Sequence, residues 1–276
     1  MKYYSLGMIR SFAKRNNSSV FYEAGMDLNL KGKRAIVTGG SRGIGKTILE
    51  TLAKEGAAVA TCARGEERLN STLSELKEYG IPVYGEAVDV TDTDAFTAWF
   101  DRAATFLGGV DIFVSNCSTR VQAQGEERWR QTFEYDLLQH IRATELAIPY
   151  LEEGVDPAIV MISSIAYAMA APPEEERAYA AMKAGLVSYG SQMSIVHGSK
   201  GIRVNVVSPG PIFSEGGTWD QIRQNMPDMY KRAQSLATLK RLGTTQEVAN
   251  AIGFLASPAA SFITGANLRV DGGMLK

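Results

Sequence analysis

The chain has 276 residues, of which 45% are hydrophobic and 21% are charged, with a formal net charge of −1. This length accommodates one large α/β domain or two small ones, either with a sizeable core. A charge so close to zero provides no field that would gather nucleic acid or an anionic membrane. No apolar run approaches the roughly 20 residues that span a bilayer. We therefore expect a globular protein without nucleic-acid or membrane partners.

The cysteines and histidines are few and scattered. Cys62 and Cys117 are the only cysteines, and His140 and His197 are the only histidines. Two cysteines form no disulfide framework, which fits a reducing, cytoplasmic location. None of the four has metal-ligand spacing, so we expect no metal held by the protein.

The first 25 residues differ from the rest, because they carry four basic residues and no acid before Glu23. A transit-like or membrane-surface segment has this charge pattern. The segment lacks the uninterrupted apolar core of a secretory signal. We interpret residues 1–25 as a flexible or mis-started extension and residues 26–276 as the folded domain.

From Lys33 onward, short apolar runs alternate with helical stretches. The runs are β-branched and mostly continuous, as in strands that are buried on both faces of a parallel sheet. The pattern predicts an α/β fold, a doubly wound seven-stranded parallel sheet in a single domain. The predicted strands are 34–39, 57–64, 81–90, 110–116, 158–164, 202–208 and 266–272.

The segment between the last two predicted strands is longer than one crossover helix. It includes Trp219, Met226, Met229 and Tyr230. An inserted helix over the carboxyl edge of the sheet would be a lid or a pocket wall. A surface or subunit-contact helix would give the same pattern. We expect a lid-like insertion at about 211–240.

Residues 36–48, IVTGGSRGIGKTI, satisfy two motif patterns. Residues 40–47 spell G-x-x-x-x-G-K-S/T, the phosphate loop of nucleotide hydrolases, and residues 39–43 spell G-x-S-x-G, the nucleophile elbow of α/β-hydrolases. The same glycines suggest a dinucleotide turn, although the strict G-x-G-x-x-G is absent. All three motifs join a strand to a helix, so local context does not separate them.

The rest of the chain disfavours two of these interpretations. A phosphate-loop ATPase needs a strand-end aspartate for magnesium, and only Asp89 is available, while Lys46 also fits an exposed helix position. A hydrolase needs a histidine downstream of the serine. His197 would have to serve, yet it lies near a helix end, before a strand.

The dinucleotide interpretation follows from the physics of the turn. Glycines let the backbone approach a pyrophosphate, while the next helix points its free N–H groups at it. The second strand should end about 20 residues further on, at a residue that contacts the adenosine ribose. That residue is Arg64. An acid there would bind the 2′-hydroxyl of NAD, whereas Arg64 and the nearby Arg42 favour the 2′-phosphate of NADP.

Thr38-Gly39-x-x-x-Gly43-x-Gly45 resembles the T-G-x-x-x-G-x-G signature of the short-chain dehydrogenase/reductase family. The match continues with Asp89-Val90, with AYAAMKAG at 178–185 as the Y-x-x-x-K segment, with VNVVSPGPI at 204–212 and with RVDGG at 269–273. It covers about residues 28–273 and is most similar to the 3-oxoacyl-carrier-protein-reductase-like and the sugar or steroid dehydrogenase groups.

The resemblance implies a Rossmann fold and an NAD(P)-dependent oxidoreductase, which interconverts a small-molecule carbonyl and a secondary alcohol by hydride transfer. It also implies a homotetramer or homodimer. We expect NADP(H) to be preferred over NAD(H).

Tyr179 and Lys183 are four positions apart and therefore lie on one helix face. A tyrosine with a pKa near 10 is a slow acid/base at neutral pH unless a cation stabilises its phenolate. Lys183 would supply that charge and, by resemblance, bind the nicotinamide ribose. The family register makes Ser164 the residue that binds the substrate oxygen, with Ser163 as a rival. Asp136 occupies the position of the family's catalytic-tetrad asparagine.

The resemblance places the cofactor along a set of residues near the carboxyl ends of the strands. Ile212 would bind the carboxamide through its backbone, and Ser214 through its hydroxyl. The expected cofactor-binding residues are Gly39, Ser41, Arg42, Gly43, Ile44, Gly45, Arg64, Asp89, Val90, Asn116, Tyr179, Lys183, Pro209, Gly210, Ile212 and Ser214.

Two sites depart from the family pattern. The family's N-N-A-G reads S-N-C-S at 115–118, so Ser118 adds a side chain beside the cofactor and the substrate. Cys117 is either a reactive thiol or a small buried filler. Asp136 places a carboxylate near Lys183. The alternatives to the NADP-dependent enzyme are therefore the same chemistry with NAD, or a catalytically weak binding or regulatory protein with this fold.

Overall fold

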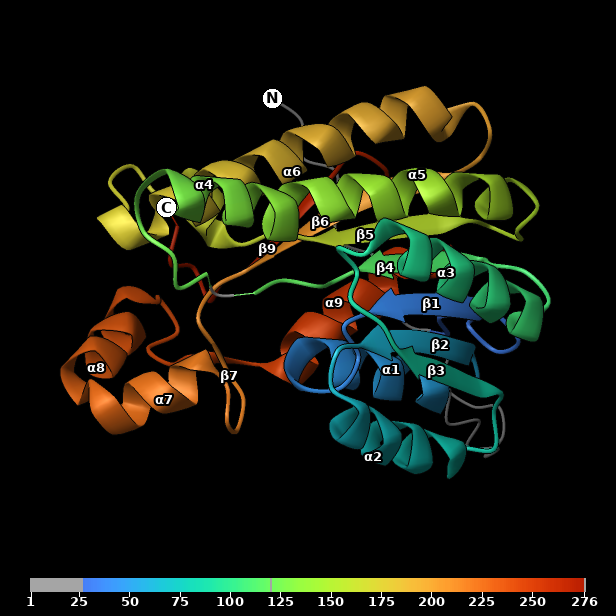
Figure 1. The fold of residues 1–276 in the computed structure, drawn as a ribbon, viewed down its shortest axis with the longest axis horizontal. Helices are drawn as coiled ribbons and strands as arrows, with labels where there is room; N and C mark the ends of the chain where they lie inside the picture. The colour runs from blue at the N-terminus through green and yellow to red at the C-terminus, as the bar shows by residue number, and fades with distance from the viewer. Residues whose placement is uncertain (1–26, 120, 276) are drawn as a thin grey trace, which may run out of the picture.

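A seven-stranded parallel sheet forms the centre of the protein (Figure 1). The computed structural model describes residues 27–119 and 121–275, so the predicted extension at 1–25 lies outside the described residues. The strands follow the order β3-β2-β1-β4-β5-β6-β9. They are β1 (Arg34–Thr38), β2 (Ala58–Ala63), β3 (Val83–Ala87), β4 (Ile112–Ser115), β5 (Ala158–Ile162), β6 (Arg203–Pro209) and β9 (Asn267–Val270).

The sheet confirms the predicted doubly wound Rossmann fold. Every neighbouring pair of its strands is parallel. The strand order reverses between β1 and β4, which creates a switch point where the loops after these two strands diverge. Ligands in open α/β sheets bind at the carboxyl ends of the strands beside such a point.

Helices cover both faces of the sheet. One face carries α1 (Gly43–Lys54), α2 (Glu66–Lys77) and α9 (Thr245–Ala256), and the other carries α3 (Thr93–Leu107), α5 (Gln139–Glu152) and α6 (Glu174–Gly198). Each face has its own core. Ile48 and Leu52 of α1 are fully buried in the first core, and Trp99 and Phe100 of α3 are fully buried in the second. Because apolar side chains shield both faces of the strands, the strand sequences are continuously hydrophobic.

The helix α4 (Gly125–Phe133) continues into α5 through a π-helical turn at Glu134–Leu138. Such a turn inserts one residue into the helical repeat and is often found at functional sites. Asp136 lies in this turn and is fully buried. The turn packs against α6 and therefore directs Asp136 toward that helix.

An ion pair ties β1 to the loop before β4. The Asp111 carboxylate is 2% exposed. It accepts hydrogen bonds from Arg34 Nη2 at 2.6 Å and from the backbone N–H of Val155 at 2.7 Å. Desolvation by burial raises the pKa of Asp111, but the hydrogen bonds from Arg34 and Val155 outweigh it, so the pKa is lowered.

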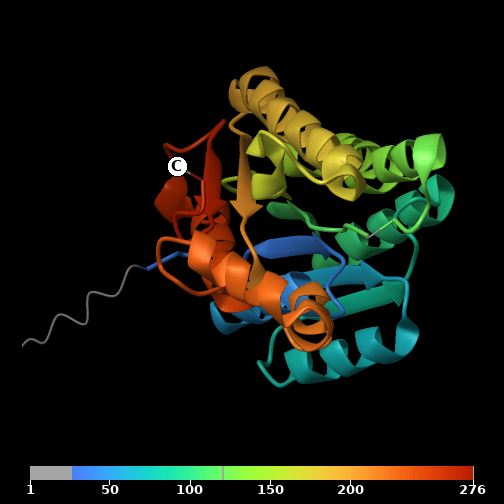
Figure 2. The same ribbon diagram turned by 90° about the vertical axis from the view of Figure 1, so that its left-hand side faces the viewer.

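The segment between β6 and β9 forms two helices, α7 (Thr218–Asn225) and α8 (Pro227–Leu236), where one was expected. Pro227 explains the break, since proline disfavours a helical conformation in the preceding residue and fits the first position of a new helix. Two short strands, β7 (Ile212–Phe213) and β8 (Gly243–Thr244), flank the pair and form a separate sheet. Figure 2 shows α7 and α8 in front of the sheet, on the side toward which the strands point.

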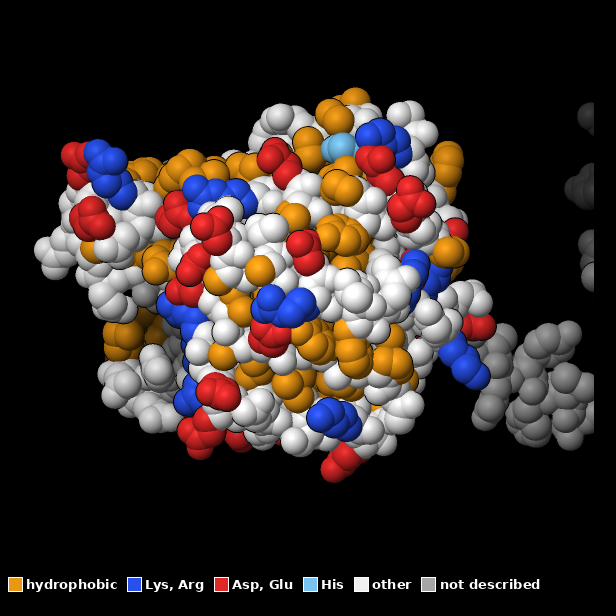
Figure 3. Space-filling view, turned by 45° about the vertical axis from the view of Figure 1, so that its right-hand side comes forward, with side chains coloured by type: hydrophobic (Ala, Val, Ile, Leu, Met, Phe, Trp, Pro, Cys, Tyr) orange, Lys and Arg blue, Asp and Glu red, His pale blue; other side chains and the backbone are white. Residues whose placement is uncertain are grey.

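The surface carries charges of both signs. On the face shown in Figure 3, acidic and basic side chains are interspersed among apolar ones. In the described part of the chain, no helix has the length and apolar character that crossing a membrane requires.

Candidate functional site

The loop between β1 and α1 is packed too closely for side chains. Gly39 has a positive φ of 76°, which favours glycine. A Cβ on Gly45 would lie 2.2 Å from the carbonyl oxygen of Gly39 and 2.6 Å from Asn116 Nδ2. Asn116 Nδ2 donates to the carbonyl oxygens of Thr38 at 2.9 Å and of Gly39 at 3.2 Å. The loop is thereby fixed against the end of β4.

Two buried threonines support this loop. Thr38 belongs to the family signature, but neither Thr38 nor Thr61 was expected as a cofactor-binding residue. Thr38 Oγ1 accepts from the backbone N–H of Asn116 at 3.0 Å. Thr61 Oγ1 accepts from the backbone N–H of Gly40 at 3.0 Å and donates to the carbonyl of Val37 at 2.7 Å. Their signal in the sequence is a threonine in each of the first two strands, next to the glycine loop.

The start of α1 fits an anionic group. Its N-cap residue, Arg42, makes no side-chain capping hydrogen bond, so its side chain does not satisfy the first N–H groups of the helix. A Cβ on Gly43 would meet only Ser214 Oγ, at 3.8 Å, among the described atoms. This end of the loop is therefore open, and it carries the partial positive charge of a helix N-terminus.

Arg64 directly follows β2 and is exposed, as is Arg42. The Arg64 guanidinium donates to Thr119 Oγ1 over a long 3.4 Å. Asp89 follows β3, and its Oδ1 accepts from the N–H of Thr91 at 3.0 Å and from its hydroxyl at 2.8 Å. The Asp89 side chain thus closes a local turn.

The geometry weighs against the phosphate-loop ATPase. Lys46 Nζ is paired with Glu75 at 2.6 Å and with Glu50 at 3.7 Å. The Thr47 hydroxyl donates to the carbonyl of Gly43 at 3.1 Å. The two side chains that would bind phosphate and magnesium in a phosphate loop therefore have other partners.

The hydrolase interpretation fails on topology. His197 is in the last turn of α6, which leads into the amino end of β6. Ser41 follows the carboxyl end of β1. Because all strands of the seven-stranded sheet are parallel, the two residues lie at opposite ends of the strands and cannot form a catalytic pair.

Tyr179 and Lys183 both lie on α6, and Lys183 is only 1% exposed. Its ammonium donates to the carbonyl oxygen of Ile162 at 3.2 Å and lies 5.6 Å from the centre of the Tyr179 ring. Its backbone carbonyl accepts a hydrogen bond from Ser163 Oγ at 2.9 Å. Lys183 is thus anchored to the end of β5 from both its side chain and its backbone.

The two neighbouring serines differ in what their hydroxyls do. Ser163 is 4% exposed, and its hydroxyl donates to Lys183. Ser164 is partly exposed, and its Oγ accepts from the N–H of Ala166 at 3.2 Å. Ser163 therefore has a structural partner for its proton, while the Ser164 proton is available for a ligand oxygen.

Asp136 is fully buried beside Lys183. Its Oδ1 lies 3.3 Å from Lys183 Nζ and accepts from Ser118 Oγ at 2.6 Å. The two departures from the family pattern are therefore in direct contact. This contact places a carboxylate at the amine, as expected, and adds a partner that the sequence did not indicate.

Two nearby titratable groups are held neutral. Desolvation by burial raises the pKa of the Cys117 thiol to about 11, which argues for a packing role and against a reactive thiolate. Burial and then the charge of Lys183 lower the pKa of His140. The Nδ1 of His140 is hydrogen-bonded to Ser115 Oγ at 2.7 Å. Neither group adds charge at neutral pH.

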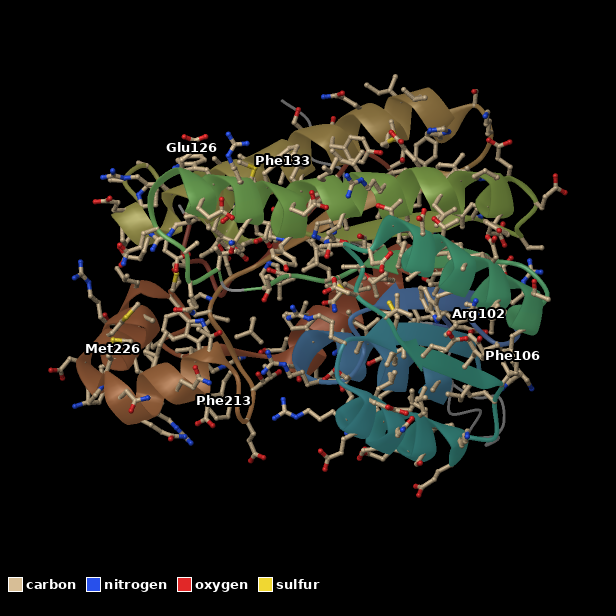
Figure 4. All side chains as sticks on the ribbon, viewed as in Figure 1. Arg102, Phe106, Glu126, Phe133, Phe213 and Met226 are labelled. Atoms are coloured by element: carbon tan, nitrogen blue, oxygen red, sulfur yellow. The ribbon has the colours of Figure 1, made fainter. Side chains whose placement is uncertain are left out.

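The chain after β6 closes the other end of the site. The Gly210 N–H donates to the carbonyl of Val270 at 2.9 Å, next to Pro209 at the end of β6. Ile212 pairs with Gly243 in the small sheet. Arg223 of α7 stacks over the ring of Phe213, labelled in Figure 4, with 4.9 Å between the guanidinium carbon and the ring centre. This contact fixes α7 to β7 beside the strand ends.

The structure thus brings the predicted residues together around the switch point. Gly39 to Gly45 follow β1, Arg64 follows β2, Asn116 follows β4, Ser164 follows β5, and Ser214 reaches the glycine loop. No cluster of three metal-binding side chains exists within 27–119 and 121–275.

Comparison with known proteins identifies the family of the chain. A family model described as enoyl-(acyl carrier protein) reductase matches residues 39–275. An isoepoxydon dehydrogenase of Penicillium expansum is 35% identical over 252 residues, which are 89% of this chain and 95% of that protein. A 3-oxoacyl-(acyl-carrier-protein) reductase of Escherichia coli is 36% identical over 253 residues, 90% of this chain and 99% of that one.

Among solved structures, L-sorbose reductase from Gluconobacter frateurii, in complex with NADPH and L-sorbose, superposes with a TM-score of 0.83 and 31% identity. The match covers 91% of this chain and 99% of that chain. The protein is thus an NAD(P)-dependent oxidoreductase and belongs to the short-chain dehydrogenase/reductase family.

Proposed function

We propose that the protein is an NADP-dependent oxidoreductase that interconverts a small-molecule carbonyl and a secondary alcohol with a Ser164-Tyr179-Lys183 centre. The observation that carries the proposal is the position of Lys183. Its buried ammonium lies 5.6 Å from the centre of the Tyr179 ring and is anchored to the carbonyl of Ile162. A fixed cation at this place favours the ionised form of the tyrosine.

The cofactor site fits the residues present. The uncapped start of α1 and the open side of Gly43 would hold the pyrophosphate. Asp89 and Val90 would lie along the adenine. Asn116, Pro209, Gly210, Ile212 and Ser214 would line the nicotinamide end. When bound, the nicotinamide supplies or accepts the hydride.

The side chains of the chain handle the proton. Ser164 donates a hydrogen bond to the substrate oxygen and so orients the carbonyl. Tyr179 transfers its phenolic proton to that oxygen as negative charge develops on it, and recovers a proton afterward. Lys183 stabilises the phenolate that remains, because its charge is held in a buried, low-dielectric place. The reverse transfer serves alcohol oxidation.

NADP is proposed over NAD because Arg42 and Arg64 are both exposed beside the glycine loop. Each guanidinium offers charge-assisted hydrogen bonds to a 2′-phosphate. The position after β2 carries no acid that would bind a free ribose hydroxyl pair. Similar structures hold NADPH, NADH or NAD, so support for NADP comes from the two arginines alone.

A panel of small ketones and secondary alcohols tests the proposal, with NADPH consumption or NADPH formation as the readout. The names of two similar proteins make isoepoxydon and L-sorbose the first members of the panel. Turnover with NADPH, at a higher kcat/KM than with NADH, is the expected result. Binding of NADPH without turnover of any carbonyl would instead favour the weak, regulatory alternative.

The assembly and the location stay predictions from the family resemblance. We expect a homotetramer or a homodimer, which analytical ultracentrifugation of the full chain measures. We expect a cytoplasmic location, which fractionation of the source cells measures. The lid-like role of residues 211–240 is a proposal of the same kind, and substrate protection of this segment from proteolysis tests it.

A further inference from the structure

One oxygen of Asp136 serves two partners. Ser118 Oγ donates to Oδ1 at 2.6 Å, and Lys183 Nζ lies 3.3 Å from the same atom. Within the described residues, the buried Oδ2 of Asp136 has no hydrogen-bond partner. The orientation of the whole carboxylate is therefore set through Oδ1.

The two contacts at Oδ1 are not equally close. Hydrogen bonds between an ammonium and a carboxylate are typically about 2.7–2.9 Å long, so the 3.3 Å contact with Lys183 is stretched. The 2.6 Å contact with the Ser118 hydroxyl lies within the usual range of about 2.5–2.7 Å for a hydroxyl that donates to a carboxylate. The carboxylate is thus held by the serine and not closed onto the lysine.

The Lys183 ammonium also contacts groups other than Asp136. It donates to the carbonyl of Ile162 at 3.2 Å and lies near the Tyr179 ring. A carboxylate that closed fully onto the ammonium would neutralise the field that Tyr179 needs for ionisation. Keeping Oδ1 at a distance limits this loss.

We propose that Ser118 is a positioning residue that tethers Asp136, so that the Asp136 carboxylate does not close onto Lys183 and the ammonium charge remains available to Tyr179. This inference rests on the proposed function. It joins two residues whose side chains come from the loop after β4 and from the π-helical turn, and it gives Ser118 a role in the chemistry besides its effect on the shape of the pocket.

The other titratable groups around Asp136 do not replace the Ser118 hydroxyl as a tether for the Asp136 carboxylate. From α5, His140 has a lowered pKa and is bonded to Ser115. After β4, the pKa of Cys117 is raised to about 11. On the π-helical turn itself, Glu134 is paired with Arg142 at 2.6 Å. On α4, Glu126 is paired with Arg130 at the surface. From α6, Lys183 faces Asp136, and the Lys183 ammonium lies 5.6 Å from the centre of the Tyr179 ring.

The test compares pH profiles of alcohol oxidation in the full-length protein. Ser118→Ala should let the carboxylate approach Lys183 and raise the apparent pKa of the profile by about half to one pH unit. Turnover at neutral pH should fall roughly three- to tenfold, in proportion to the lost phenolate. Asp136→Asn should shift the profile in the opposite direction. Ser118→Ala/Asp136→Asn should follow Asp136→Asn alone.

Controls separate this role from loss of packing. Ser118→Thr keeps the hydroxyl and should keep the parent profile, while Ser118→Gly lacks it and should shift like Ser118→Ala. Ser71→Ala removes a similar contact, because Ser71 Oγ donates to Glu75 at 3.2 Å and Glu75 pairs with Lys46 on the surface. It should leave the profile unchanged.

An unchanged profile in both hydroxyl-free variants, a shift to lower pH, or the same shift in the Asp136→Asn background would each overturn the proposal. A second readout does not depend on turnover. The ultraviolet difference titration between each protein and its Tyr179→Phe counterpart reports the ionisation of Tyr179 alone. If the protein turned over no carbonyl, the proposed function would fail, while this titration would still decide whether Ser118 controls the Tyr179 pKa through Asp136.

Discussion

Asp136 Oδ1 and Lys183 Nζ lie 3.3 Å apart, and their side chains are 0% and 1% exposed. Burial of two opposite charges is costly unless they are paired and further hydrogen-bonded. Here Ser118 and the carbonyl of Ile162 provide the additional bonds. In the proposed mechanism, the ionisation of Tyr179 therefore depends on Lys183, Asp136 and Ser118 together.

The first prediction concerns the charge of Asp136. Asp136→Asn preserves the shape of the side chain but removes a negative charge that opposes the Tyr179 phenolate. At an effective dielectric of about 20, unit charges 4 Å apart interact by roughly 4 kcal/mol, so a visible shift is expected even after solvent screening. The pH profile of alcohol oxidation should move to lower pH by about one unit, and turnover near neutral pH should rise. Identical profiles in the two proteins would mean that Asp136 contributes only its backbone.

The second prediction concerns Arg64. Replacement by aspartate should abolish or reverse the preference for NADPH, since the new carboxylate repels a 2′-phosphate and can accept from a free ribose hydroxyl. Two charge-assisted contacts at about 1.5–3 kcal/mol each imply a preference of roughly a hundredfold or more in the parent. Isothermal titration with NADPH and NADH measures it. Equal affinities in the unmodified protein would contradict the assignment of NADP.

The third prediction is that the glycine loop is neither an ATP site nor an esterase. Lys46 is held by Glu75, and the hydroxyl of Thr47 by the carbonyl of Gly43. ATP with magnesium should therefore leave the melting temperature unchanged, whereas NADPH should raise it. Ser41 should not be labelled by a fluorophosphonate, because His197 lies at the opposite end of the parallel strands and the fully buried His140 is hydrogen-bonded to Ser115. A covalent adduct on Ser41, located by mass spectrometry, would support the hydrolase interpretation instead.

The fourth prediction concerns stability and Asp111. Its pKa is lowered from the ordinary value of 3.8 in the folded state, so the carboxylate stabilises the fold above that value. This contribution is lost as the pH falls through the lower folded pKa. Asp111→Asn should cost about 2–3 kcal/mol at neutral pH, because Arg34 loses a buried partner. The variant should also lose less stability on acidification below about pH 4 than the parent does, as measured by urea unfolding at several pH values. If the two proteins lost equal stability on acidification, a group other than Asp111 would cause the acid dependence of stability.

The fold was predictable because sheet strands buried on both faces leave continuous runs of β-branched residues. Six of the seven predicted runs contain a strand of the sheet, and the run at 202–208 overlaps β6 except at Pro209. The short strands β7 and β8 were missed because two residues carry no periodicity. The two-helix form of the insertion was also missed, although Pro227 marks the break.

The site was less predictable than the fold. Glycines, Tyr179 and Lys183 have fixed spacings in the sequence that reflect their chemistry. The contact between Ser118 and Asp136 has no such signal, because the two residues come from different elements. It also depends on the π-helical turn at Glu134–Leu138, which a helical repeat of about 3.6 residues does not reveal. The choice between Ser163 and Ser164 likewise needed the bond from Ser163 to Lys183.

The central step of the proposed mechanism is proton transfer from Tyr179 to a carbonyl that receives hydride from NADPH. The decisive measurement uses NADPH labelled with deuterium at the transferred position, a ketone that the protein reduces, and mass spectrometry of the alcohol. The unmodified protein should place deuterium on the carbinol carbon. Tyr179→Phe should bind NADPH within a few fold of the parent and lose roughly 10²–10⁴ in turnover. Full activity in Tyr179→Phe, or alcohol formed without deuterium, would contradict the mechanism.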